Sequence, residues 1–451
     1  MISYFLLIFL AVYLPFEPFI NKFIPDRWYL VWVNLPEILI FLTLSAVLYE
    51  FFFLKTPEER ERIFKSKERK KVIIVFIIFC AWGVASALIN WQSLVTATVG
   101  LRQIFRFSAL IPVVYLDNLN KQHAKKIINV IMGVVILQAL LGLSQVILPS
   151  QLSAFFAGRE DRIAISFNAP VFEPNWLLGA RATGTLARYD RLGIFLSLGL
   201  ILLLVFRRFN LFVIAFVALL FTYSRTAWLG TCGAIIYFLV ELKKFNFLKI
   251  LGLLFAAMII SIFIYSFSLP YPVRFIQESY RQNIAQRILQ TFSRSEMELS
   301  EERFGRIYFW KESLGKVIKD NFIFGVGPGR YGGGATSILD NKSVYDKYSI
   351  PFGIENKSGQ IDNNWLSLWG ELGTGGLIIF ILLLCVLWGL SQSIFKNLND
   401  DFSQDLSLTA RCFIVAYSVF ALFGPYFEIK APAFFFWVVA SLLLINYEEQ
   451  S

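Results

Sequence analysis

Long apolar stretches separated by short polar segments dominate the chain from end to end. Two examples are residues 127–148 (IINVIMGVVILQALLGLSQVIL) and 249–269 (KILGLLFAAMIISIFIYSFSL). Each has the roughly 20 apolar residues that an α-helix needs to cross a bilayer. The pattern therefore predicts an all-α integral membrane protein with about twelve transmembrane helices. The expected spans are 2–20, 29–54, 72–91, 94–116, 127–148, 191–206, 211–224, 226–242, 249–269, 366–391, 409–425 and 432–447.

Composition strengthens this interpretation. Of the 451 residues, 57% are hydrophobic and 16% are charged, whereas soluble domains have about 45–50% apolar and about 25% charged residues. A soluble enzyme and a disordered chain are both excluded. The net charge of +10 does not indicate nucleic acid, because the positive residues lie between apolar spans and not along one soluble face.

The distribution of Lys and Arg predicts the orientation. Residues 55–71, residues 117–126, the pair Arg207 and Arg208, and the pair Lys243 and Lys244 fall on one side of the twelve-span arrangement. The positive-inside rule makes that side the cytoplasm and places both termini there.

Two long segments, 149–190 and 270–365, then face outward. The second is a large extracytoplasmic loop within a single polytopic domain, 1–451, and loops of that length usually carry function. Apolar residues spaced three to four apart predict two amphipathic helices in it, at 276–292 and 304–318.

Arginine is the main cation of both outward segments, and guanidinium groups bind phosphate through two hydrogen bonds. An anionic ligand is one explanation, and solvated arginines that pair with the acidic residues of the loop are the other. Three further arginines lie next to apolar spans. Arg225 sits where one span ends and the next begins, so its charge must lie at the membrane boundary or face a polar cavity. Arg102 and Arg106 share a helix face and either bind a ligand or extend toward the interface.

Two further segments of the large loop are notable. The glycine cluster FGVGPGRYGGG (324–334) lacks the Gly-Lys-Ser/Thr ending of a nucleotide-binding loop, so a tight loop in which the backbone approaches another group is expected. Asp362, Asn363 and Asn364 come just before a membrane span. Asp362 could act as a general base, and a plain helix N-cap at Asp362 or Asn363 explains the same residues.

Four segments, in order, resemble the O-antigen ligase and O-antigen polymerase superfamily of membrane glycosyltransferases. Similarity lies in RATGTLARYDRLGIFL (181–196), TYSRTAWLG (222–230), GRIYFWKESLGKVIKDNFIFGVGPGRY (305–331) and DNNWLSLWGELGTGGL (362–377). Leu186 replaces the family's Phe, and Asp190 replaces an Asn. Asp362 replaces the histidine common in ligases, which favours a polymerase, because polymerase-like members tolerate an acid there.

The resemblance implies a polyprenyl-pyrophosphate-linked glycan as donor, a glycan or lipid-linked acceptor, and action at the outer face of the bacterial cytoplasmic membrane. Asp362, Arg225 and Arg306 are the expected catalytic residues. The expected substrate-binding residues are Arg181, Arg191, Arg303, Arg330, Asn363, Arg102 and Arg106. No Asp-x-Asp triplet occurs in the sequence, so no metal and no other cofactor is expected. A lipid-linked oligosaccharide flippase or another transporter is the alternative from a different class, although such proteins usually show repeats, midplane charges or broken helices.

Overall fold

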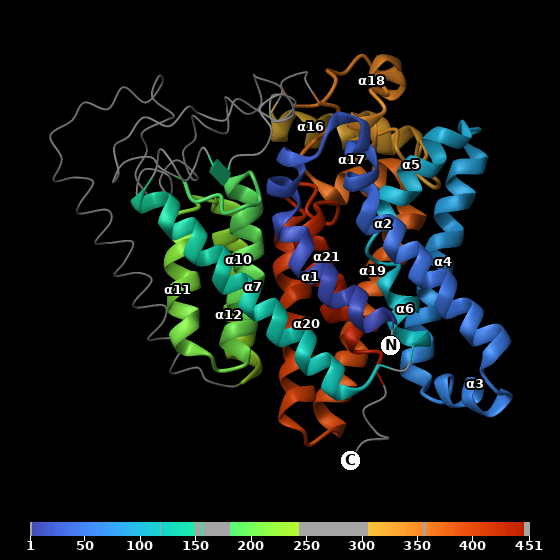
Figure 1. The fold of residues 1–451 in the computed structure, drawn as a ribbon. Helices are drawn as coiled ribbons and strands as arrows, with labels where there is room; N and C mark the ends of the chain where they lie inside the picture. The colour runs from blue at the N-terminus through green and yellow to red at the C-terminus, as the bar shows by residue number, and fades with distance from the viewer. Residues whose placement is uncertain are drawn as a thin grey trace, which may run out of the picture. The chain divides into compact units, whose positions relative to one another are not determined.

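The computed structural model describes residues 2–117, 119–148, 155–156, 181–242, 305–354 and 358–445. In these ranges the chain is helical and forms no strand, apart from one isolated bridge between Gly332 and Gln360 (Figure 1). The prediction of an all-α protein is therefore confirmed.

The helices follow the apolar stretches closely. In chain order they are α1 (Ile2–Ile20), η1 (Asn21–Phe23), α2 (Asp26–Tyr49), η2 (Glu50–Leu54), α3 (Pro57–Ile63), α4 (Lys67–Ile89), α5 (Leu94–Phe105), α6 (Leu110–Leu116), α7 (Lys121–Ile147), α10 (Tyr189–Val205), α11 (Phe209–Leu220), α12 (Arg225–Glu241), α16 (Arg306–Glu312), η3 (Ser313–Ile318), α17 (Gly334–Ile338), α18 (Ser343–Tyr348), α19 (Asn364–Asn397), α20 (Asp401–Phe420) and α21 (Lys430–Leu442).

Twelve transmembrane helices are not confirmed. Among the described residues, five helices are long and apolar enough to cross a membrane, or six if the bent pair α5 and α6 counts as one span. The expected span 249–269 lies outside the described residues. All the remaining expected spans overlap helices. Some of these helices are short. The 12 residues of α11 would extend only about 18 Å at about 1.5 Å per residue, less than the hydrocarbon thickness of about 30 Å.

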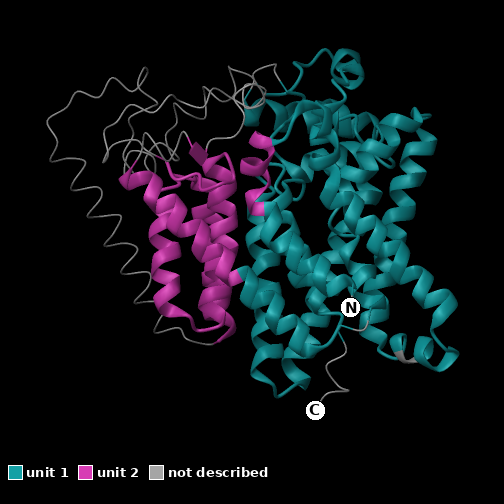
Figure 2. Cartoon of the chain, in the orientation of Figure 1, with its two compact units in different colours: residues 1–14, 24–131, 299–451 teal, residues 15–23, 132–298 magenta. Residues whose placement is uncertain are grey.

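Contacts divide the chain into two compact units (Figure 2). Unit 1 contains residues 1–14, 24–131 and 299–451, and unit 2 contains residues 15–23 and 132–298. In unit 2, α10 packs against both α11 and α12. In unit 1, α19 packs against α4 and α20, and α21 packs against α6. The expectation of one polytopic domain, 1–451, stays a prediction.

Two helical segments of unit 1 are broken. The axes of α5 and α6 differ by 60°. Helix α19 is interrupted at Gly373, whose φ of 69° and ψ of −175° are not helical and are open essentially only to glycine. Amide groups freed by the break are satisfied by residues 322 and 323, because Thr374 N donates to the Phe322 carbonyl at 2.7 Å and Gly375 N to the Ile323 carbonyl at 3.3 Å.

The described part of the large loop folds into a small cap at one end of unit 1, opposite α3 (Figure 1). The predicted helix at 304–318 is present as α16 and η3, and Phe309, Val317 and Ile318 bury its apolar face in the cap core. Leu314 lies four residues before the buried Ile318, a spacing that predicts the same buried helix face, but its side chain is exposed. Residues 313–318 form a wider π-type turn, which rotates the buried side away from that position. The other expected helix, 276–292, lies outside the described residues.

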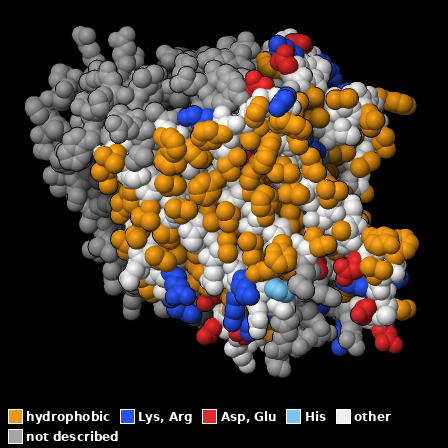
Figure 3. Space-filling view, in the orientation of Figure 1, with side chains coloured by type: hydrophobic (Ala, Val, Ile, Leu, Met, Phe, Trp, Pro, Cys, Tyr) orange, Lys and Arg blue, Asp and Glu red, His pale blue; other side chains and the backbone are white. Residues whose placement is uncertain are grey.

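Apolar side chains also cover the outside of the helices. Figure 3 shows hydrophobic side chains over much of the visible face. The exposed large hydrophobic residues include Leu42 on α2 and Ile77 on α4. A water-soluble protein would not expose such a large apolar surface. The helices and their surface show that the chain is a multi-pass membrane protein.

Candidate functional site

The cap brings Arg306 and Asp362 together. Arg306 is the first residue of α16, and its Nη2 donates a hydrogen bond to Oδ2 of Asp362 at 3.1 Å. The side chains are 41% and 27% exposed, so the ion pair is partly accessible. Asp362 adopts the left-handed backbone conformation, with φ of 48°, which Asp and Asn tolerate better than most residues.

The three residues Asp362, Asn363 and Asn364 have separate tasks. Asn363 is the N-cap of α19, because its Oδ1 accepts the Leu366 amide at 3.0 Å. Asn364 turns inward, where its Nδ2 donates to Oε1 of Glu428 at 3.2 Å. Asn363 is therefore the residue that acts as helix N-cap. The carboxylate of Asp362 instead accepts a hydrogen bond from Arg306.

The glycine cluster is a tight loop against helix backbones, as expected. A Cβ on Gly100 of α5 would lie 2.4 Å from the Pro328 carbonyl carbon, and a Cβ on Gly325 would lie 2.4 Å from the Glu371 carbonyl oxygen. The loop amides do not face an open anion site. Gly329 N and Tyr331 N both donate to Oε1 of Glu371, at 3.0 and 3.3 Å. An internal carboxylate thus occupies the position that a phosphate would need.

Arg330 projects from this loop toward the end of α4. Its Nη1 lies 3.4 Å from the carbonyl oxygens of Asn90 and Val326. Partial burial lowers the pKa of the guanidinium, although an arginine stays charged at neutral pH. Asn90 is the C-cap of α4, so Arg330 complements the negative end of that helix.

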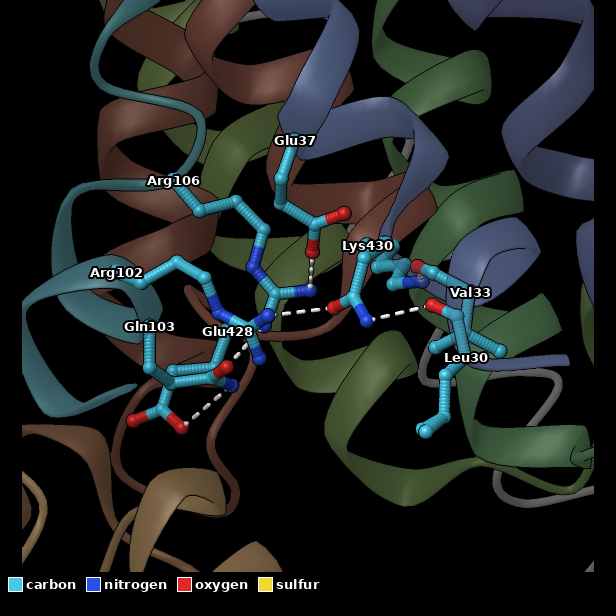
Figure 4. Close-up of polar contacts among 9 residues, drawn as sticks. Leu30, Val33, Glu37, Arg102, Gln103, Arg106, Glu428 and Lys430 are labelled. Carbon is cyan, nitrogen blue, oxygen red and sulfur yellow. Dashed lines mark hydrogen bonds and ion pairs between the residues drawn. The ribbon is translucent and has the colours of Figure 1, made fainter. Parts of the chain in front are cut away.

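Arg102 and Arg106 both bind α2 (Figure 4). Arg102 Nη1 donates to Oδ1 of Asn34, and Arg106 Nη1 forms an ion pair with Glu37 Oε1 at 3.0 Å. Arg106 is 5% exposed, so it does not extend to the interface. Its Nη2 also donates to Oε1 of Gln103.

The network continues from Gln103 to a carboxylate that the sequence reasoning missed. Gln103 Nε2 donates to Oε2 of Glu428 at 3.1 Å (Figure 4), and the same oxygen accepts Gly334 N at 2.7 Å. The only sequence signal was an acid between two apolar spans, a position where a buried charge is costly and usually has a partner. Its partners lie 94 and 325 residues away, so no spacing pattern could reveal them.

In unit 2, the motif that begins at Arg181 is held by two glutamines of α7. Gln145 Oε1 accepts the amides of Thr183 and Gly184 at 2.9 and 2.8 Å, and Gln138 Oε1 accepts that of Thr185 at 3.0 Å. Sequence reasoning missed both glutamines, although two such polar residues seven apart on one face of an apolar span are a usable signal.

The other predicted residues of unit 2 lie before or at the starts of α10 and α12. The Arg181 guanidinium lies over the Tyr189 ring, 4.4 Å from its centroid. Arg191 follows in the first turn of α10. Arg225 is the first residue of α12, directly after the N-cap Ser224 and the left-handed Tyr223. Arg303 lies outside the described residues.

No group of three or more His, Cys, Asp or Glu side chains in the described part of the chain could hold a metal ion. Residues 210–381 match the family described as O-antigen ligase. That range includes the Arg225 turn, the Arg306 helix, the glycine loop and the Asp362 segment, and it confirms the resemblance to the O-antigen ligase and polymerase superfamily. None of the curated proteins compared with the chain matches it.

Proposed function

We propose that this multi-pass membrane protein, whose residues 210–381 belong to the O-antigen ligase family, is a glycosyltransferase that uses a polyprenyl-pyrophosphate-linked glycan as donor. The observation that carries the proposal is the Arg306–Asp362 ion pair, at 3.1 Å, within the matched region. It combines a carboxylate that can accept a proton with a guanidinium that can bind phosphate.

The proposed reaction is direct displacement at the anomeric carbon. An acceptor sugar hydroxyl attacks that carbon and gives its proton to Asp362, while the bond to the pyrophosphate oxygen breaks and the electron pair leaves with the pyrophosphate. Attack opposite the leaving group inverts the anomeric centre. Negative charge grows on the leaving group, where fixed guanidinium groups stabilise it without a metal.

Arg306 and Arg225 are the first residues that we propose to stabilise the leaving pyrophosphate, and Arg181 is the next. Arg306 also orients the carboxylate of Asp362 before the acceptor arrives. Arg191 and Arg303 are proposed to bind the donor. Arg102, Arg106, Arg330 and Asn363 each have a partner in the chain, so their contribution to binding would be to shape the site.

A polymerase is proposed in preference to a ligase, because Asp362 stands where ligases commonly have histidine. The acceptor would then be another lipid-linked glycan, and the product a longer lipid-linked chain. We place the reaction at the outer face of the bacterial cytoplasmic membrane, with the basic segment 55–71 and both termini in the cytoplasm, and we expect no cofactor.

A transporter of lipid-linked oligosaccharides is the second candidate, and one observation favours it. Helix α19 breaks at Gly373, and α5 and α6 form a bent pair, as helices near transporter substrate sites often do. The break in α19 is filled by backbone of the cap, however, and Glu371, two residues before the break, accepts hydrogen bonds from the loop amides.

The experiment that tests the proposal supplies the purified protein with a polyprenyl-pyrophosphate repeat unit as sole substrate and resolves the products by chain length. A ladder of longer lipid-linked glycans is the result expected of a polymerase. Transfer only after a separate lipid acceptor is added would establish a ligase. Absence of transfer under both conditions, together with movement of the lipid-linked glycan across proteoliposome membranes, would establish the transporter.

A further inference from the structure

Two carboxylates accept hydrogen bonds from the backbone of the glycine loop. Glu371 accepts the amides of Gly329 and Tyr331, and Glu428 accepts that of Gly334. The Glu371 side chain is buried, and that of Glu428 is half-buried. Buried carboxylates in a membrane protein are costly and are usually functional, so their common partner is informative.

The two carboxylates converge on Gly333. A Cβ at this position would lie 3.1 Å from Glu428 Oε1 and 3.5 Å from Glu371 Oε1. A cavity of about 30 Å³ lies beside them, with Asn364, Ser367 and Glu428 among its lining residues. A cavity of this size has room for a water molecule beside the polar side chains of its mostly apolar lining. Burial raises the pKa of the Glu428 carboxyl.

The loop that they grip is joined to the segment that carries Asp362. Gly332 forms a bridge with Gln360, and its carbonyl accepts the Ile361 amide at 3.3 Å. Asp362 is the next residue. On its other side, Asn364 donates to Glu428. Glu428 therefore supports both flanks of Asp362. It binds Gly334 of the loop that is bridged to residues 360 and 361, and it binds Asn364 on the other flank.

One ion pair and two hydrogen bonds in series fix the orientation of the Glu428 side chain. Glu37 binds Arg106, Arg106 donates to the Gln103 oxygen, and Gln103 consequently turns its Nε2 toward Glu428 (Figure 4). Every hydrogen bond described here for the two Glu428 oxygens comes from an N–H donor. An amide in its place would direct an NH₂ group at one of these donors.

We propose that Glu428, with Glu371, is a positioning residue that holds the glycine loop and the start of α19 so that Asp362 meets Arg306. This inference rests on the proposed glycosyl transfer and adds to it the residues that fix the geometry of the base. A misplacement of about 1 Å can reduce a rate by about 100-fold. The effect of Glu428 and Glu371 should therefore appear in kcat more than in KM, because the Asp362 carboxylate that they position acts in the transition state.

The test compares full-length wild-type protein with Glu428→Gln, Glu371→Gln and Gly333→Ala, with Asp405→Asn as the matched control. Asp405 is a buried acid of α20 in the same unit, away from the loop. Gly333 has a φ of −92°, so alanine fits the backbone, and its Cβ would contact the two carboxylates and the Ser367 hydroxyl. This variant keeps the test decisive if Glu428→Gln fails to fold.

Two measurements are made on each protein: kcat and KM for glycan transfer, and hydrogen–deuterium exchange of peptides that cover 325–334 and 358–366. For Glu428→Gln we expect kcat about 100-fold lower, KM within twofold of wild type, and exchange at least tenfold faster in those peptides alone. Gly333→Ala should lower kcat several-fold in the same manner, and Asp405→Asn should change neither measurement.

Wild-type exchange and wild-type kcat in Glu428→Gln and Gly333→Ala would overturn the inference while leaving the proposed function intact. Faster exchange with unchanged kcat would reduce both glutamates to structural groups and would also overturn it. A wild-type protein that transfers no glycan would overturn the proposed function, and the catalytic part of the inference would fall with it.

Discussion

Arg306 Nη2 lies 3.1 Å from Asp362 Oδ2, although the two residues are 56 positions apart in the chain. The core of the cap brings them together: Phe309 of α16, Tyr331 of the glycine loop and Ile361 are packed in one buried cluster. This packing holds the Arg306 guanidinium and the Asp362 carboxylate at hydrogen-bond distance.

The break in α19 gives a sharp stability prediction. Gly373→Ala would place a Cβ 2.2 Å from the Ile323 carbonyl oxygen at a φ of 69°, so we expect a loss of about 3 kcal/mol or more, or failure to fold. Gly389→Ala on the same helix is the control, because apart from its chain neighbours and its own helix backbone no atom lies within 4 Å of the added Cβ. Thermal unfolding in detergent measures both, and equal stability of the two variants would contradict the account of the break.

The positions of the helices could be predicted from the sequence, because burial in lipid needs only a local run of apolar residues. The break at Gly373 could not, since it depends on backbone from residues 322–327 that fills the gap. The rotated face of α16 and η3 was missed for a similar reason, because a π-type turn changes the spacing of buried positions.

The candidate site was predicted in part. Arg306 and Asp362 were each found by their motif, and the structure adds that they touch. Glu37, Gln103 and Glu428 were missed, because the contacts that link them join parts of the chain that are far apart in sequence. Hydropathy indicates that such a residue is costly but does not identify the partner that offsets the cost.

The buried ion pair between Glu37 and Arg106 predicts an asymmetric response. Removing only one partner, as in Glu37→Leu, leaves the other charge buried and should cost roughly 3–5 kcal/mol. The double variant Glu37→Leu with Arg106→Leu should recover most of that stability. Unfolding temperatures of the three proteins test this, and a double variant less stable than either single variant would contradict a simple pair.

The same double variant tests whether Arg106 binds substrate directly. If Arg106 only supports Gln103 and Glu428, the stable double variant should keep KM for the donor within about threefold of wild type. A KM at least tenfold higher at restored stability would show direct binding by Arg106.

Arg225→Lys tests the role of the planar guanidinium. Lysine keeps the charge and loses the bidentate geometry, so we expect kcat at least about tenfold lower without loss of folded protein. Arg208→Lys, at an exposed position before α11, is the control and should behave as wild type. Wild-type kcat in Arg225→Lys would make Arg225 a structural charge.

Asp400 predicts a pH dependence of stability. Burial by itself would raise the pKa of this carboxyl, but hydrogen bonds from Lys121 and from Ser403 outweigh it and hold the pKa below its usual range. The folded pKa is depressed, so the stabilisation is present above the unfolded value, about 3.9, and is lost as pH falls through the folded value.

The corresponding variants separate the ion pair from the helix cap. Asp400→Asn keeps an N-cap for α20 and should lose the acid dependence, whereas Asp400→Ala should also lose about 1 kcal/mol of capping. Unfolding temperatures between about pH 3 and 7 measure both effects, with Asp401→Asn as the neighbouring control. An unchanged acid profile in Asp400→Asn would show that other groups control it.

Asp362→Asn tests the central claim most directly. Asparagine has nearly the same shape and tolerates the left-handed backbone at this position, and it can still accept a hydrogen bond from Arg306. It cannot accept a proton from the acceptor hydroxyl. Folding and donor binding should therefore survive while chemistry stops.

The measurement is single-turnover glycan transfer with a radiolabelled polyprenyl-pyrophosphate donor, together with donor binding to the same purified protein. The account predicts a donor Kd within about threefold of wild type and transfer at least about 100-fold slower in Asp362→Asn, the loss typical of a removed general base. Transfer at the wild-type rate with normal donor binding would contradict it and remove Asp362 from the mechanism.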